Sequence, residues 1–354
     1  MDINNLSIDE KIGQRFIVGV NNTNIDIIVD LIKNGYIGGV ILYKRNYKNY
    51  DDMLKIVKKF KEANKNNKVP LFIAIDQEGG RVNRLPNEIH NLKNIYDVSK
   101  KDSSLVADYA DIISKILTKS GINMNFAPVL DIYNGSKSKA LDKRCFYGNS
   151  REISKMAICY IESTKKNGII SVVKHYPGHG ATRVDSHFLI PFEFNYREVL
   201  NKHIVPFNRL IENGADAMMV GHMCIRKLTG FLPASLSNKF INNHLDNYNG
   251  LLISDEVNML KRHLIYRINF YNKIINSPCD FILIKIKDLS EGYKLINKFK
   301  NSIVNDIQYE KILDRHVTRV LDIKKKYNIN DNISFDGIDV DEINREIDLL
   351  NSKI

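Results

Sequence analysis

The chain has 354 residues, of which 44% are hydrophobic, and a formal net charge of +11. This is enough for a substantial core, and although the length allows two or three domains, barrels of this size commonly form one. No apolar run approaches a membrane span, the first five residues show no signal peptide, and the four scattered cysteines suit a reducing compartment. We therefore expect a cytoplasmic protein with no membrane partner.

The positive charge is compatible with nucleic-acid binding, but its distribution is not typical of it. The lysines are spread among asparagines and acids along predicted helices, as at Lys55, Lys58 and Lys59. No basic block interleaved with stacking aromatics occurs. We expect solvated helix faces and no nucleic-acid partner, while a basic surface can help to attract an acidic substrate.

Eight strand-like apolar runs recur along the chain with helical segments between them. They cover residues 15–20, 39–43, 71–75, 124–130, 170–173, 217–220, 251–253 and 281–286. The helical spacing of Ile25, Ile28 and Leu31 ends at Gly35, and a second apolar helix face over 199–211 ends at Asn213-Gly214. Alternating strands and helices predict a parallel sheet, either a (β/α)8 barrel or an open doubly wound sheet.

Polar residues repeatedly follow these runs, which favours the barrel because it gathers all strand ends around one mouth. They are Asp76, Glu78, Asp131, Lys174, His175, His222, Asp255 and Glu256. The long segments 77–101 and 132–150 can wall the resulting pocket. We predict one α/β barrel domain over 1–328 and a tail over 329–354, in which 343–350 forms a helix packed on the barrel.

The densest polar cluster is 174–180 (KHYPGHG), followed by Asp185-Ser186-His187. In extended backbone Asp185 and His187 point the same way, so the carboxylate can hold the imidazole and stabilise its protonated form. This favours proton transfer over a purely structural cluster. A zinc site with His175, His179 and His187 as ligands is an alternative, opposed by the Pro177-Gly178 pair, which argues against a helix there.

Four segments resemble the family 3 glycoside hydrolases: 74–82 (AIDQEGGRV), 126–132 (FAPVLDI), 174–180 (KHYPGHG) and 253–255 (ISD). The resemblance runs from about residue 8 to residue 260. The Asp185-Ser186-His187 triplet points to the single-domain β-N-acetylglucosaminidases of peptidoglycan recycling. The resemblance implies an enzyme that removes terminal β-linked N-acetylglucosamine from GlcNAc-MurNAc or GlcNAc-anhydroMurNAc fragments. We expect it to act as a monomer, without a cofactor or a metal ion.

The resemblance also implies roles for single residues. Asp255 matches the nucleophile of a retaining mechanism, and His187 the general acid/base with Asp185 as its partner. A histidine, with a pKa near 6.5, can donate to the leaving oxygen and then accept a proton from water. The residues that match sugar-binding or pocket-lining positions are Asp76, Arg144, Lys174, His175, His222 and Asp131.

Two departures keep other hypotheses open. Ala181 stands where many relatives carry an acid, and Glu256 replaces a second aspartate; strand alternation predicts that Glu256 points away from Asp255. An Asp255-Glu256 pair is also the signature of substrate-assisted hexosaminidases. A metal-dependent hydrolase and a non-catalytic binding protein are further alternatives, whereas a two-domain β-glucosidase fits less well because no second domain follows the barrel.

Overall fold

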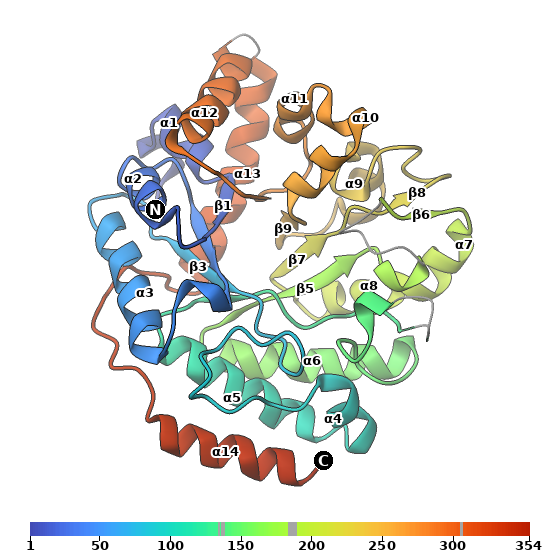
Figure 1. Ribbon diagram of the computed structural model, residues 1–354. Helices are drawn as coiled ribbons and strands as arrows, with labels where there is room; N and C mark the ends of the chain where they lie inside the picture. The colour runs from blue at the N-terminus through green and yellow to red at the C-terminus, as the bar shows by residue number, and fades with distance from the viewer. Residues whose placement is uncertain (134, 136–138, 183–189, 305–306) are drawn as a thin grey trace.

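Eight parallel strands form a barrel at the centre of the protein, seen along its axis in the computed structural model of Figure 1. The structure describes residues 1–133, 135, 139–182, 190–304 and 307–354. The strands, in their spatial order, are β10 (Ile282–Ile284), β1 (Phe16–Gly19), β2 (Gly39–Leu42), β3 (Phe72–Ile75), β4 (Met124–Asn125), β5 (Ile170–Tyr176), β7 (Ala217–Val220) and β9 (Leu251–Ser254). A bridge between Ile253 and Phe281 joins the two ends of the order. The predicted (β/α)8 barrel is confirmed, and the open sheet is excluded.

The helices surround the barrel, as the ring of ribbons in Figure 1 shows. They are α1 (Ile8–Gly13), α2 (Ile25–Lys33), α3 (Tyr50–Asn64), α4 (Ile95–Lys101), α5 (Leu105–Lys119), α6 (Ser150–Lys166), α7 (Tyr196–Glu198), α8 (Val205–Glu212), α9 (Asn238–Leu245), α10 (Leu264–Arg267), α11 (Phe270–Ile275), α12 (Leu289–Val304), α13 (Ile307–Lys326) and α14 (Val340–Ser352). Among the described helices, none is long and apolar enough to cross a bilayer.

The end of α2 illustrates how the sequence sets these boundaries. Gly35 adopts φ 68°, its N–H bonds the Ile32 carbonyl, and the Tyr36 N–H bonds the Leu31 carbonyl. These are the two hydrogen bonds of a Schellman motif, which favours glycine because the backbone turns left-handed there. The predicted stop at Gly35 is therefore confirmed.

Both faces of the barrel strands are buried, which explains their nearly continuous apolar sequences. Ile41 points into the barrel with Phe72 and Phe281, whereas Val40 and Leu42 face the helices. Lys324 of α13 closes the N-terminal end of the barrel: its Nζ donates to Gln14 Oε1, Gly38 O and Pro70 O at 2.8, 3.1 and 2.6 Å. The opposite, C-terminal end is the one that remains open.

After α13 the chain returns along the barrel to α14, which packs against α5. Ile343, Ile347 and Leu350 form its buried face. Its polar side is tied to the segment after β3, since the Asn344 and Asn351 side chains accept from the His90 and Lys93 backbone N–H groups at 2.7 and 2.9 Å. The predicted amphipathic stretch 343–350 thus lies inside a helix that braces a loop of the open end.

Three local features differ from what the sequence led us to expect. The strand predicted over 124–130 ends at Asn125, because Pro128 has no N–H for a ladder, and only Val129 continues with single bridges to Cys145 and Lys174. The helical stretch predicted over 199–211 ends at Asn213-Gly214 as expected, but it begins as a π-helix, Val199–His203, before α8 (Val205–Glu212). A two-stranded sheet of β6 (Phe192–Glu193) and β8 (Cys224–Ile225) was not predicted, since two-residue strands carry almost no periodicity.

Candidate active site

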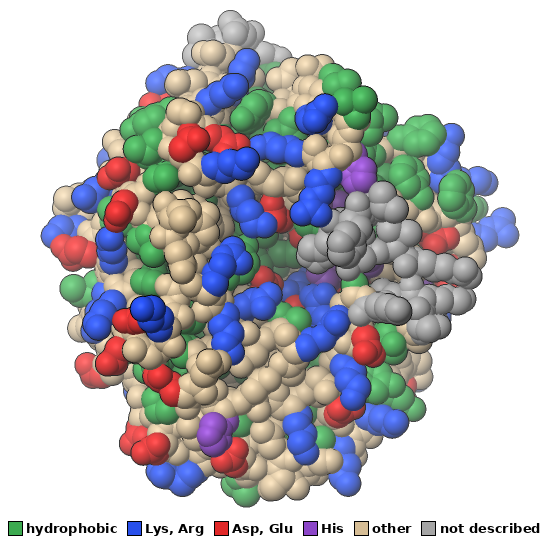
Figure 2. Space-filling view, in the orientation of Figure 1, with side chains coloured by type: hydrophobic (Ala, Val, Ile, Leu, Met, Phe, Trp, Pro, Cys, Tyr) green, Lys and Arg blue, Asp and Glu red, His purple; other side chains and the backbone are tan. Residues whose placement is uncertain are grey.

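A cavity of about 470 Å³ opens at the C-terminal ends of the strands. Figure 2 shows lysine and arginine side chains around the hollow at the centre of this face. Its lining includes the predicted residues Asp76, Arg144, Lys174, His175 and Asp255. The segments after β3 and β4 contribute to its wall, as expected. The strand ends therefore meet around one mouth, which is where barrel enzymes place their chemistry.

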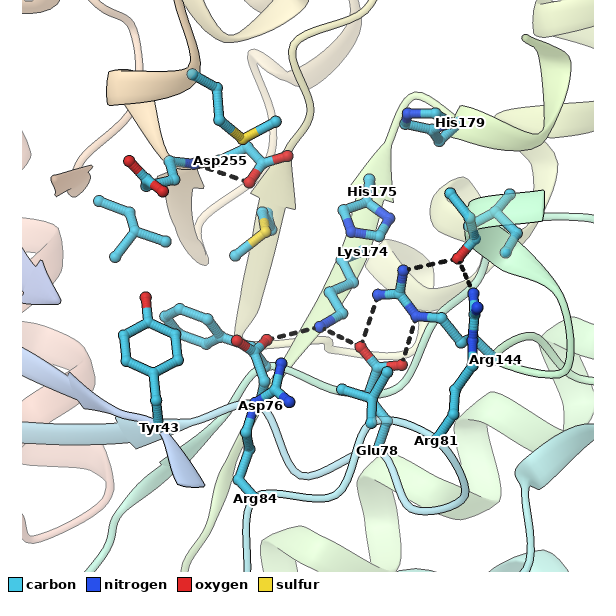
Figure 3. Close-up of a pocket in the computed structure, with 18 of the residues that line it drawn as sticks. Tyr43, Asp76, Glu78, Arg81, Arg84, Arg144, Lys174, His175, His179 and Asp255 are labelled. Atoms are coloured by element: carbon cyan, nitrogen blue, oxygen red, sulfur yellow. Dashed lines mark hydrogen bonds and ion pairs between the residues drawn. The ribbon is translucent and has the colours of Figure 1, made fainter. Parts of the chain in front are cut away.

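Glu78 is the centre of a charged network on one side of this cavity. Its carboxylate accepts from Arg144 Nε and Nη2, both at 2.8 Å, and pairs with Lys174 Nζ at 2.6 Å. Lys174 Nζ also donates to Asp76 Oδ1 at 2.8 Å. The Glu78 side chain is only 4% exposed. Figure 3 shows these four side chains converging from three different segments.

The charges of this network stabilise one another. Burial alone raises the pKa of Glu78, but the attraction of Arg144 and Lys174 outweighs it and holds the pKa well below its usual range. Burial alone lowers the pKa of Arg144, but the attraction of Glu78 outweighs burial, and the Arg144 pKa is raised. Glu78 and Arg144 thus favour each other's charged form, and the contacts of the network are in place before any ligand arrives.

A tight turn after β3 places Glu78 in the cavity. Gly79 and Gly80 have φ values of 80° and 55°, and a Cβ at Gly79 would stand 1.8 Å from the Tyr109 hydroxyl. That hydroxyl donates to the Glu78 carbonyl at 2.7 Å. Asn125 of β4 fixes the start of the turn, with its side chain bonded to both the N–H and the carbonyl of Gln77. Only glycine at position 79 permits this packing.

Asp131 lies behind the cavity, not in it. It is completely buried, and its Oδ2 accepts from His175 Nδ1 at 2.7 Å, while Oδ1 accepts from the His179 N–H at 2.5 Å. Burial raises the Asp131 pKa, but His175 and His179 lower it below its usual range. The expectation that Asp131 meets the sugar is corrected: the structure makes it the residue that orients His175.

His222 is likewise buried and is not part of the cavity lining, contrary to expectation. Its Nε2 donates to the Glu256 carbonyl at 3.1 Å, and Nδ1 lies 2.7 Å from Ser235 Oγ. Because a carbonyl only accepts, Nε2 must carry the proton. Burial lowers the His222 pKa, which keeps the ring neutral. His222 therefore anchors the backbone next to Asp255.

Asp255 and Glu256 both line the cavity. Figure 3 shows Asp255 across the cavity from the Asp76–Lys174–Glu78 network. Its Oδ1 accepts from the Glu256 N–H at 2.8 Å, and the Glu256 carboxylate pairs with Lys285. Strand β9 ends at Ser254, so strand alternation does not apply to this pair, and the orientation expected for Glu256 stays a prediction.

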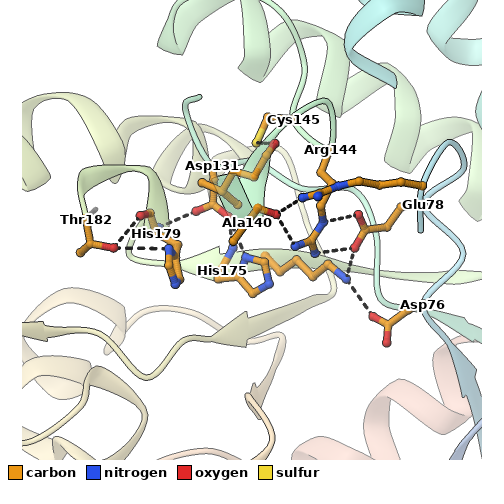
Figure 4. Close-up of polar contacts among 12 residues, drawn as sticks. Asp76, Glu78, Asp131, Ala140, Arg144, Cys145, His175, His179 and Thr182 are labelled. Carbon is orange, nitrogen blue, oxygen red and sulfur yellow. Dashed lines mark hydrogen bonds and ion pairs between the residues drawn. The ribbon is translucent and has the colours of Figure 1, made fainter. Parts of the chain in front are cut away.

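The predicted acid/base pair, Asp185 and His187, lies outside the described residues. On its near side the chain is described up to Thr182, whose hydroxyl is 3.4 Å from His179 Nδ1 (Figure 4). Within the described ranges, no three His, Cys, Asp or Glu side chains are grouped to hold a metal ion. His175 instead takes a carboxylate partner, and His179 is buried, which lowers its pKa.

Sequence reasoning assigned no role to several lining residues, among them Tyr43, Arg84 and Lys285. Arg84 stands two residues beyond the recognised segment 74–82, and its buried Nε has no hydrogen-bond partner among the described residues. The sequence signal that could have placed Arg84 in the cavity is its position eight residues after Asp76 in the same loop. No sequence signal marked Lys285, at the end of β10, as a cavity residue, because a lone lysine after a strand is usually exposed to solvent.

A (β/α)8 barrel with carboxylates on both sides of a cation-lined cavity has the architecture of a barrel hydrolase acting on a polar substrate. The family model "Glycosyl hydrolase family 3 N terminal domain" matches residues 7–323. The chain therefore belongs to glycoside hydrolase family 3, and the resemblance read from its sequence is confirmed.

Its similar relatives include curated β-hexosaminidases. The Methylobacillus flagellatus protein is 29% identical over 280 residues, covering 76% of this chain and 78% of that protein, and the Psychromonas ingrahamii protein is 29% identical over 282 residues, covering 77% and 82%. Among solved structures, a family 3 β-N-acetylglucosaminidase from Paenibacillus sp. str. FPU-7 superposes with a TM-score of 0.87 at 26% identity, covering 98% of this chain and 69% of that one. The predicted enzyme class, a family 3 β-hexosaminidase, is confirmed.

Proposed function

We propose that this hexosaminidase removes terminal, non-reducing β-linked N-acetylglucosamine from peptidoglycan fragments by a retaining mechanism, as a monomer in the cytoplasm. The observation that carries the proposal is the position of Asp255 across the cavity from the Asp76–Lys174–Glu78–Arg144 network. One side offers a nucleophile and the other a preset array of donors and acceptors.

The network is suited to hold the terminal sugar. Asp76 can accept from hydroxyls while Lys174 and Arg144 donate to them, and His175 is oriented by Asp131 for the same task. Fixed charges cost no reorganisation when positive charge develops at the anomeric carbon. The sugar would be held with that carbon toward Asp255.

In the proposed reaction an Asp255 oxygen attacks the anomeric carbon while the glycosidic C–O bond breaks. The protonated His187 gives its proton to the leaving oxygen, and Asp185 stabilises the imidazolium. A water molecule then attacks the glycosyl-aspartate, His187 takes its proton, and the Asp255 carboxylate is released. Two inversions leave the anomeric configuration unchanged.

The basic character of the site supports an acidic substrate. Arg81, Arg84 and Lys285 line the cavity in addition to Arg144 and Lys174, and the whole chain carries a net charge of +11. A lactyl carboxylate on the second sugar and the acids of a peptide stem would be attracted to such a surface. GlcNAc-MurNAc and GlcNAc-anhydroMurNAc fit this description.

The first experiment is release of 4-nitrophenol from its β-N-acetylglucosaminide, with the β-glucoside and EDTA as comparisons. Selective release that survives EDTA is expected, together with complete loss in Asp255→Ala and retention of the fold by circular dichroism. Release of 4-nitrophenol by Asp255→Ala at wild-type rate would overturn the nucleophile assignment. Inhibition by EDTA would instead support the metal-dependent alternative.

A second candidate mechanism is substrate-assisted, with the acetamido oxygen as nucleophile and Glu256 as acid. It is favoured by the position of Glu256 on the same cavity. Against it, the Glu256 carboxylate is engaged by Lys285, whereas an acid must offer its proton to the leaving oxygen. Trapping with a 2-fluoro glycoside distinguishes the two, since only the Asp255 mechanism yields a labelled aspartate.

A further inference from the structure

More than half of the exposed large hydrophobic side chains in the described residues lie in three short segments. They are Phe192 and Phe194, Phe231 and Leu232, and Leu264, Ile265 and Ile268. Phe194, Leu264 and Ile265 are 71%, 63% and 61% exposed. Single exposed apolar residues need no explanation, but a contiguous group usually marks an interaction site.

The three segments form one continuous surface, which we call the apolar–basic face. Strand β6 pairs with β8, and the rings of Phe192 and Phe231 lie 6.2 Å apart. Tyr266 of α10 donates its hydroxyl to the Phe231 carbonyl, which joins α10 to the same surface. In Figures 1 and 2, β6, β8 and α10 lie at the upper right, where hydrophobic side chains gather.

The same face is strongly basic. Arg226, Lys227, Arg262 and Arg267 are exposed on it, and the segments 226–232 and 261–269 contain no acidic residue. The Arg226 guanidinium stacks 4.3 Å from the Phe231 ring centroid. Glu193 of β6 is an acidic neighbour, but the four cations of the face outnumber it. Apolar tips among arginines are the composition of an interfacial helix or loop.

The face begins at the rim of the active-site cavity. Glu256 and Met259 line the cavity, and the 3-10 helix that includes Met259 (Val257–Arg262) runs directly into α10. Whatever covers the apolar–basic face therefore lies beside the mouth through which substrate enters.

We propose that the apolar–basic face docks on an anionic lipid bilayer. Leu264, Ile265 and Phe194 would enter the headgroup boundary while the arginines meet lipid phosphates and carboxylates. A second copy of this chain is a poor occupant, because an isologous contact would set the same cations against each other. Nucleic acid would leave the aliphatic side chains exposed. The proposal is independent of the proposed reaction, since none of these residues belongs to the cavity.

The test is co-sedimentation of the full chain with vesicles of phosphatidylcholine alone and with 30% phosphatidylglycerol, at low and high salt. Binding is expected only with the anionic lipid and should weaken as salt rises. Arg262→Ala/Arg267→Ala should bind roughly 25-fold more weakly, because each cation near such a surface contributes about five-fold. Leu264→Ser/Ile265→Ser should also lose binding.

Matched controls carry the same changes elsewhere: Leu349→Ser/Ile333→Ser for exposed apolar residues and Lys119→Ala/Lys353→Ala for exposed cations. These should bind vesicles like the wild type, and all variants should keep hydrolysis of the soluble aryl glycoside. Equal binding of face and control variants overturns the proposal. Absence of vesicle binding also overturns the proposal. In that case light scattering would show whether the wild type forms a dimer that Leu264→Ser/Ile265→Ser loses, and a binding assay with an anionic polymer would show whether the face takes a polyanion instead.

Discussion

Replacing Glu78 with glutamine tests the central role of the charged network. The amide keeps the shape but loses the charge that pairs with Arg144 and Lys174, at 2.8 and 2.6 Å. Removing one partner from a buried pair costs about 3–5 kcal/mol. With an unfolding entropy of about 2.1 cal/mol/K per residue, this corresponds to a melting temperature roughly 4–7 °C lower.

The loss in activity should exceed the loss in stability. Arg144 and Lys174 would no longer be fixed, and misplaced electrostatic groups lower kcat by about 10²-fold or more. The assays are thermal unfolding and kcat/KM on the aryl glycoside, with Glu88→Gln, an exposed acid of the same loop, as control. If Glu78→Gln behaved like Glu88→Gln in both assays, the reasoning about the network would be refuted.

The pH dependence of this effect has a definite sign. The folded-state pKa of Glu78 is lowered, so its stabilising contribution is present above its ordinary value of 4.5 and is lost as pH falls below it. The melting temperatures of wild type and Glu78→Gln should therefore differ at pH 7 and converge toward pH 3. A constant difference across that range would mean that packing, not charge, dominates.

Three further predictions follow from the surroundings of the cavity. Asp131→Asn should lower kcat about 10–100-fold with a smaller change in KM, because His175 loses its orienting carboxylate; steady-state kinetics checks this. Lys285→Met should lower kcat/KM, because the Glu256 carboxylate loses its cationic partner beside Asp255, whereas Lys285→Arg should restore it; steady-state kinetics checks both variants. Burial lowers the Lys324 pKa to about 7, so the unfolded chain binds more protons than the folded one above that pH. The free energy of unfolding of the wild type, measured with denaturant, should therefore rise from about pH 7 to about pH 10. Lys324→Met should not show this rise.

The fold could be predicted because its signals are local. Each barrel strand is buried on both faces, so β-branched runs such as 170–173 are visible without any partner. The end of α2 at Gly35 was equally readable. The strand predictions that failed also have local causes. Pro128 ended one predicted strand early, and two-residue strands such as β6 and β8 are too short to show an alternating pattern in the sequence.

The site could be predicted only as a set of strand-end residues, not as a set of pairs. Glu78 and Arg144 are 66 positions apart, and nothing in either segment specifies their bidentate contact. Asp131 follows a strand as a ligand-binding residue would, yet its side chain turns inward to His175. Likewise, the absence of a membrane span in the sequence says nothing about a face assembled from three separate segments.

The cationic side chains described in the cavity differ in how many hydrogen-bond donors they still have available for a substrate. Arg144 and Lys174 spend donors on Glu78 and Asp76, so they present a fixed field that is set before binding. Arg84 has a buried Nε with no hydrogen-bond partner in the described residues, and an unmet buried donor costs about 1–3 kcal/mol. A sugar hydroxyl that reached Arg84 would relieve this cost. Binding energy would therefore come from Arg84, while the Glu78 network would supply the orientation that turns binding into catalysis.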